Sequence, residues 1–109
     1  MGGRAGEISG LSVVRPVVFR PQAEHEALEA MHWYESRRAG LGAEFGESLA
    51  ALLMRVASNP LSFPAVYLEA RRAVLARFPY AVFFRFADET VVVLSVHGRK
   101  DPRRWQGRM

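Results

Sequence analysis

A titratable ring and a run of cations follow the last apolar stretch of the chain. His97 could act as a general base. Cations beside an aromatic ring could bind a nucleic-acid backbone and stack a base. The alternative is a disordered basic tail whose tryptophan folds back onto the domain. The cations and the aromatic residue are Arg99, Lys100, Arg103, Arg104 and Trp105.

Four further arginines lie among the apolar residues before that tail. Arg71 and Arg72 precede residues 73–76, Arg77 follows them, and Arg85 interrupts the aromatic run at 81–86. Because successive side chains of a strand point to opposite faces, some of these guanidinium groups should project from a sheet face that no helix covers. Guanidinium forks suit phosphates and stack on flat rings. The alternative is ordinary snorkelling at sheet edges.

No other reactive side chains form a recognisable site. His25 and His32 are about two helical turns apart, whereas the zincin motif places its histidines one turn apart. Gly40 lies between two predicted helices, which is not the context of a phosphate-binding loop. We therefore expect no metal and no cofactor. The glutamates of the first helix are expected to form a solvated face: Glu24, Glu26, Glu29 and Glu35.

The composition predicts one small cytoplasmic domain. Of the 109 residues, 50% are hydrophobic and 24% charged, which is typical of a globular chain. The absence of cysteine excludes disulfides and a thiol nucleophile and suits the reducing cytosol. No apolar run is long enough to span a bilayer. The net charge of +4 resides in residues 99–109, which have five basic residues and one acidic residue.

The chain pattern predicts two helices after an edge strand. Residues 1–12 are glycine-rich and are expected to be a disordered leader, with a single domain over 13–109. The segment around Pro16 should be extended, and because proline cannot donate a strand hydrogen bond, we expect it at the edge of the sheet. The first helix is expected over about 22–38 and the second over about 41–57. Because their link is short, they should form an antiparallel hairpin, with Gly40 capping the end of the first helix.

An antiparallel meander is expected to follow the helices. Residues 73–76, 81–86 and 91–96 are apolar, aromatic and β-branched, and residues 87–90 are polar enough for a hairpin turn. The helices must cover one face of the sheet. The predicted fold is therefore α+β, a β-α-α-β-β-β order with the helical hairpin on a three- to four-stranded antiparallel sheet.

Several short motifs occur together in this order. They are Trp33-Tyr34-Glu35, the Gly40-Leu41-Gly42 link, Asn59-Pro60, Arg77-Phe78-Pro79-Tyr80 and the segment from His97 to Pro102. With this order and spacing, the chain resembles the RelE/ParE superfamily of bacterial toxins, in particular the ParE-like plasmid-stabilisation proteins. The resemblance implies a small cytoplasmic toxin neutralised by a cognate antitoxin in a hetero-oligomer.

The resemblance implies two possible targets. RelE-like members cut messenger RNA on the ribosome, whereas ParE-like members block DNA gyrase and are not enzymes. Arg99 matches the basic residue that follows the last strand in the nucleases. Trp105 stands where they have a tyrosine, and Ala81 where they have an arginine. We therefore expect a gyrase-binding toxin; the alternatives are a nuclease using His97 and Arg99, with Arg77 or Arg85 on the phosphate, and an inactive binding module.

The resemblance also implies how an antitoxin would bind. Its C-terminal segment would be disordered alone and would fold along the toxin, with apolar side chains placed in grooves. Trp33, Leu53 and Phe63 are candidate contacts, and simple core packing is the alternative for each. An acidic stretch of the same segment would reach the basic tail at Arg103 and Arg104.

Overall fold

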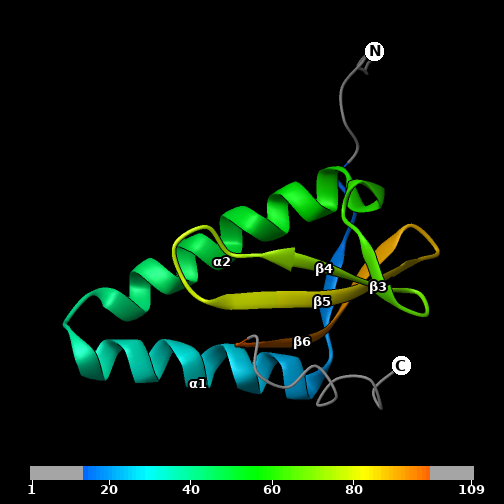
Figure 1. Ribbon diagram of the computed structural model, residues 1–109. Coiled ribbons are helices and arrows are strands. Elements are labelled where there is room, and N and C mark those ends of the chain that lie inside the picture. The colour runs from blue at the N-terminus through cyan, green and yellow to red at the C-terminus, as the bar shows by residue number, and fades with distance from the viewer. Residues whose placement is uncertain (1–13, 99–109) are drawn as a thin grey trace.

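A strand, a helical hairpin and a four-stranded meander follow one another in the computed structural model, which describes residues 14–98 (Figure 1). The helices lie over one face of a single sheet, so the predicted α+β class is confirmed. The elements are β2 (Val17–Phe19), α1 (Pro21–Arg37), α2 (Leu41–Ser58), the 3-10 turn η1 (Pro60–Ser62), β3 (Ala65–Tyr67), β4 (Ala70–Val74), β5 (Tyr80–Ala87) and β6 (Thr90–Gly98).

Within residues 14–98 the sheet has five strands in the order β2-β6-β5-β4-β3, one more than the largest number predicted. It is mixed, because β2 pairs parallel to β6 while the other pairs are antiparallel. The edge position expected beside Pro16 is correct. The additional strand β3 turns back into β4 at Leu68, whose φ of 49° is in the left-handed region. The sequence prediction of β4 was displaced, since that strand ends at Val74.

Both helices are close to their predicted limits. Pro21 stands in the first turn of α1, where its missing N–H costs nothing. Gly40 has a φ of +90° and is the N-cap of α2, whereas Arg38 is the C-cap of α1, so the predicted cap position is wrong. A Cβ at Gly42 would lie 2.6 Å from the carbonyl oxygen of Met31. Glycine therefore permits the close approach of the two helices at their link.

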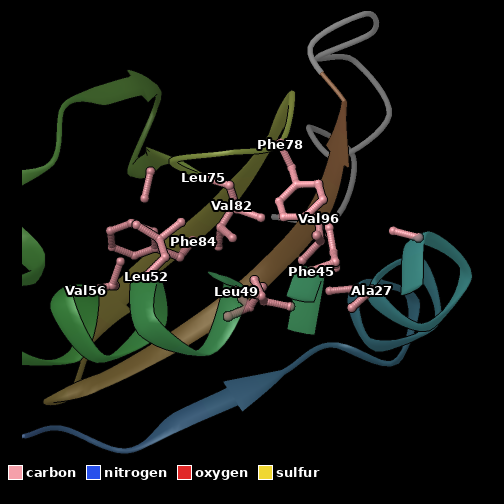
Figure 2. Packing of buried hydrophobic residues seen from close by; sticks show 14 of the residues in the cluster. Ala27, Phe45, Leu49, Leu52, Val56, Leu75, Phe78, Val82, Phe84 and Val96 are labelled. Atoms are coloured by element: carbon pink, nitrogen blue, oxygen red, sulfur yellow. The ribbon is translucent and has the colours of Figure 1, made fainter. Parts of the chain in front are cut away.

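The main core lies between the helices and the sheet (Figure 2). The predicted stripe of α2 packs on strand residues that include Val82, Phe84 and Val96. Ala23, Ala27 and Ala30 of α1 are buried in the same cluster, and their small size lets α1 lie close to β6. Within residues 14–98, no helix is long and apolar enough to cross a membrane. The buried stripe of α2 consists of Phe45, Leu49, Leu52 and Val56.

Aromatic rings close the end of this core near the helical link. The rings of Tyr34 and Phe78 are 4.8 Å apart, and that of Phe45 lies 5.2 Å from those of both Phe78 and Tyr80. Such edge-on contacts are favourable beyond the area that they bury. Burial, and to a smaller extent the neighbouring Tyr80, raises the pKa of Tyr34.

Candidate functional site on the second face of the sheet

Strand β5 divides its side chains between two separate clusters. Val82 and Phe84 belong to the core under the helices, and their neighbours Ala81 and Phe83 belong to a smaller cluster with Ala70 and Leu94. Since adjacent side chains of a strand point to opposite faces, the smaller cluster marks the face away from the helices. All its members within residues 14–98 come from strands. We call this the second face.

Two of the predicted arginines lie on the second face. Arg72 is paired with Phe83 across β4 and β5 and is exposed. Arg85 follows Phe83 by two residues and therefore shares its face. The Nε atom of Arg85 is buried and has no hydrogen-bond partner among the described residues. Two arginines thus share a face of the sheet with a buried aromatic ring.

Arg77 is not part of this arrangement. It lies in the loop between β4 and β5, and its Nη2 atom is 2.8 Å from Oε1 of Glu44 on α2. This contact is the largest cause of the lowered pKa of Glu44, to which Arg38 also contributes at 3.4 Å. The expected strand position of Arg77 is wrong, because β4 ends at Val74 and the loop carries Arg77 toward the helices.

A β-bulge in β6 brings His97 to the second face. Phe83 pairs with Ser95 and Phe84 pairs with Val93, so Leu94 is an extra residue. Before the bulge Val93 faces the helices, and after it Val96 does. His97 consequently points the other way, and its ring stacks on that of Phe83 with centroids 5.3 Å apart and an interplanar angle of 27°.

The hydrogen bond of His97 determines which nitrogen carries the proton in the neutral ring. Nδ1 lies 2.5 Å from the carbonyl oxygen of Gly98, which can only accept, so Nδ1 is the donor. Nε2 then holds the lone pair that a general base requires. It is buried and has no partner among residues 14–98, and the whole side chain is only 5% exposed. The ring has the right tautomer for a base but little access.

Glu26 of α1 is a buried carboxylate that the sequence interpretation missed. It is 7% exposed, and its Oε1 accepts hydrogen bonds from Ser95 Oγ at 2.9 Å and from the Val96 N–H at 3.0 Å. The expectation of a solvated glutamate face is therefore wrong at this position. The signal was present in the sequence, because Glu26 falls on the same helical stripe as Ala23 and Ala27.

The three candidate antitoxin contacts are not brought together. Trp33 is 50% exposed near the end of α1, with the Arg37 guanidinium 4.4 Å from its ring centroid. Leu53 is half-buried against the main core. Phe63 is also half-buried, follows α2, and lies at the opposite end of the helical hairpin from Trp33. It lines a shallow depression of about 390 Å³ with Met54, Arg55, Ser58, Asn59 and Ser62.

Two predicted regions lie outside the part of the chain that the structure describes, whereas the histidines considered as metal ligands lie inside it. The expected leader over 1–12 and the basic tail lie outside residues 14–98, so their predictions stay untested. Within that range no group of three or more His, Asp or Glu side chains could hold a metal ion. His25 instead pairs with Glu29 one turn along α1, at 3.1 Å. The undescribed tail residues are Arg99, Lys100, Arg103, Arg104 and Trp105.

Solved toxin–antitoxin structures share this fold. A chain of the chromosomal ParDE system of P. aeruginosa superposes with a TM-score of 0.65 at 12% identity, over 78% of this chain and 96% of that one. A chain of the intact E. coli RelBE complex gives 0.58 at 18% identity, over 80% and 99%. A chain of the M. tuberculosis RelBE2 complex gives 0.54 at 20% identity, over 80% and 100%.

These likenesses extend over most of the chain and nearly all of each neighbour. No protein-family model matches the sequence, and no curated protein matches it. At these identities the superpositions establish the fold, and the chain has the RelE/ParE-like fold that its motifs implied.

Proposed function

We propose that this chain is the toxin of a type II toxin–antitoxin pair and acts by binding its target, DNA gyrase, in the cytoplasm. The observation that carries the proposal is the fold shared with chains of ParDE and RelBE toxin–antitoxin structures. The motifs that resemble ParE-like proteins favour gyrase within that fold. The second face, with its exposed Arg72, is the proposed contact surface, together with the basic tail.

Three positions support binding over catalysis. Nε2 of His97 is buried, and Arg77 is engaged by Glu44. Ala81, which stands where the nucleases carry an arginine, is 0% exposed and supplies no charge. A metal-independent nuclease needs an accessible base and placed positive charge, and the described residues supply these only in part.

Expression without an antitoxin should stop growth, and the purified chain should lower the supercoiling activity of purified gyrase. Phe84→Ala, which should lower the stability of the core, serves as the destabilised control. Arg20→Gln serves as the folded control, because Arg20 is an exposed arginine at the start of α1. Normal supercoiling at saturating toxin would remove gyrase as the target.

A ribosome-dependent messenger-RNA endoribonuclease is the second candidate function. The observation that favours it is the tautomer of His97, whose Nε2 lone pair lies on the same face as two guanidinium groups. Primer extension on translated messages would then show codon-linked cuts that disappear in His97→Ala and Arg99→Ala. A complete absence of cuts from the wild-type chain would reject it. Harmless overexpression of a soluble product would instead identify an inactive binding module.

The proposed antitoxin would cover the helical layer and the basic tail. Trp33 with Arg37 has the composition of an interface hot spot, and the depression beside Phe63 could take an apolar anchor. A single segment reaching both would run along α2, whose 18 residues span about 27 Å. Trp33→Ala should weaken binding by about tenfold or more. Leu28→Ala is the matched control, since Leu28 is equally exposed on the same helix.

Charge should control how fast the antitoxin associates. An acidic stretch reaching Arg103 and Arg104 would make the association rate salt-dependent and the dissociation rate much less so. Stopped-flow binding at low and high salt measures both. If the double change of these arginines to glutamate left the association rate and its salt dependence intact, the tail would not be an antitoxin contact.

A further inference from the structure

The orientation of His97 depends on a single extra residue in β6. With regular alternation from Val93, residue 95 and His97 would point toward the helices and Val96 would point away. The bulge at Leu94 reverses this order, so that Val96 is buried under the helices and His97 stacks on Phe83. Bulges commonly re-aim a side chain in this way.

Glu26 binds the two residues that follow this bulge. β2 pairs with β6 only as far as Val93, so within residues 14–98 the later part of β6 has no neighbouring strand on that side. The Val96 N–H instead donates to Glu26 Oε1, and Ser95 Oγ donates to the same oxygen. These hydrogen bonds connect α1 to β6, and the partners are 69 and 70 residues from Glu26 in the sequence.

A buried carboxylate is a costly way to fill this position. Desolvating a charge is unfavourable unless hydrogen bonds replace its water, and an apolar side chain often packs there at no loss of stability. The neighbouring stripe residues are alanines, which shows that this side of α1 packs well with small apolar groups. A hydrogen-bonded carboxylate can fix the register of the neighbouring strand, which an alanine side chain cannot do.

We infer that Glu26 is a positioning residue whose carboxylate holds the β6 bulge and thereby directs His97 onto the second face. The functional consequence rests on the proposed function, in which that face meets the target. Burial of Val96 also favours the bulge, but burial alone does not maintain it. Both hydrogen bonds end on one oxygen, and Glu26→Gln can therefore keep them while Glu26→Ala cannot.

Nuclear magnetic resonance of the full chain tests this orientation directly. In the wild type and Glu26→Gln, the ring protons of His97 and Phe83 should show mutual nuclear Overhauser effects. In Glu26→Ala these effects should be lost, and the Val96 amide should exchange about tenfold faster or more, because its charged acceptor is gone. A Glu26→Ala chain that keeps both the ring contact and the amide protection would overturn the inference.

Ser95→Ala decides the question if Glu26→Ala does not fold. It removes one donor and leaves the carboxylate, so the His97 ring resonances should shift and Val96 exchange should increase by a smaller factor. Ser36→Ala is the control, because the Ser36 hydroxyl bonds to an exposed helical carbonyl far from β6. Unchanged His97 resonances and Val96 exchange in Ser95→Ala would contradict the inference that Glu26 holds the bulge.

Growth assays separate this inference from the proposed function. Glu26→Ala should arrest growth less than the wild type, and Glu26→Gln, which keeps the acceptor oxygen, should restore the arrest. A wild-type chain that fails to arrest growth would refute the proposed function alone. The resonance experiment would still decide whether Glu26 directs His97.

Discussion

The two faces of β5 differ in what they bury and in what they present. Under the helices, fifteen of the described residues form one buried cluster, which includes Phe84. On the second face, four described residues form the buried cluster, and two arginines and a histidine share the face with its Phe83. Neighbouring phenylalanines of one strand thus belong to two different environments, one packed under the helices and one beside guanidinium and imidazole groups.

This difference suggests that the two faces of the sheet have different roles. The hydrophobic effect and close packing depend on the number of apolar neighbours, and among residues 14–98 this number is larger on the helix-covered side. Guanidinium and imidazole groups contribute little to a core but can contact an anionic or carboxylate-bearing partner. Changes on the first face should therefore affect unfolding, and polar changes on the second face should affect activity.

Paired alanine substitutions give the largest expected effect. Phe84→Ala should lower the free energy of unfolding by about 3–5 kcal/mol, because the cavity is surrounded by many buried neighbours. Phe83→Ala should lower it by less, because fewer of the described buried residues share its cluster. Urea unfolding measures both, with Val74→Ala as an exposed control expected within about 0.5 kcal/mol of the wild type. Equal costs for the two phenylalanines would break the comparison.

Arg15 should give an intermediate effect. Its Nη1 donates to the Ser58 carbonyl at 2.8 Å, and its guanidinium carbon lies 5.5 Å from the centroid of the Phe86 ring. A cation at the end of a helix satisfies carbonyls that have no partner in the helix. Arg15→Met should cost about 1–2 kcal/mol of unfolding free energy. Arg20→Met, at an exposed arginine, is the control; equal unfolding midpoints for the two variants would contradict this assignment.

The acid limb of the stability curve should show the smallest effect. Hydrogen bonds from the Gly40 and Gly42 N–H groups lower the pKa of Glu35 below its ordinary value of 4.5, and Arg77 does the same for Glu44. Their stabilisation is complete above that value and is lost as the pH falls through the lower folded-state pKa. Melting temperatures from about pH 6 to about pH 3 should fall less steeply in Glu35→Gln with Glu44→Gln. If the pH dependence of the melting temperature were unchanged in this double variant, neither carboxylate would contribute to the acid limb.

The helices and most of the sheet were predictable because their signals are local. Periodic apolar stripes and flanking prolines defined both helices, and the polar turn at 87–90 defined the hairpin. β3 was missed as a strand because three residues give little pattern and its pairing depends on the left-handed turn at Leu68.

The site was less predictable because it depends on long-range register. The run from Val91 to Val96 is nearly all apolar, so alternation could not reveal the bulge that turns His97. Alternation predicted that some of these arginines would lie on the uncovered face, and Arg72 and Arg85 do. Arg77 does not, because the end of β4 depends on pairing with β5. The hydrogen bonds of Glu26 join α1 to β6. In the sequence, only the position of Glu26 on a buried stripe indicated that its side chain is buried.

The central claim is that an active toxin contacts its target through the second face. The direct measurement is colony formation after induction of the chain without antitoxin, for the wild type and for the double variant Arg72→Gln with Arg85→Gln. Glutamine keeps much of the side-chain length and removes the charge, and equal soluble amounts and unfolding midpoints would show an intact fold. We predict that the wild type abolishes colony formation and the double variant restores it. Equal arrest by both chains, or no arrest by the wild type, would contradict the claim.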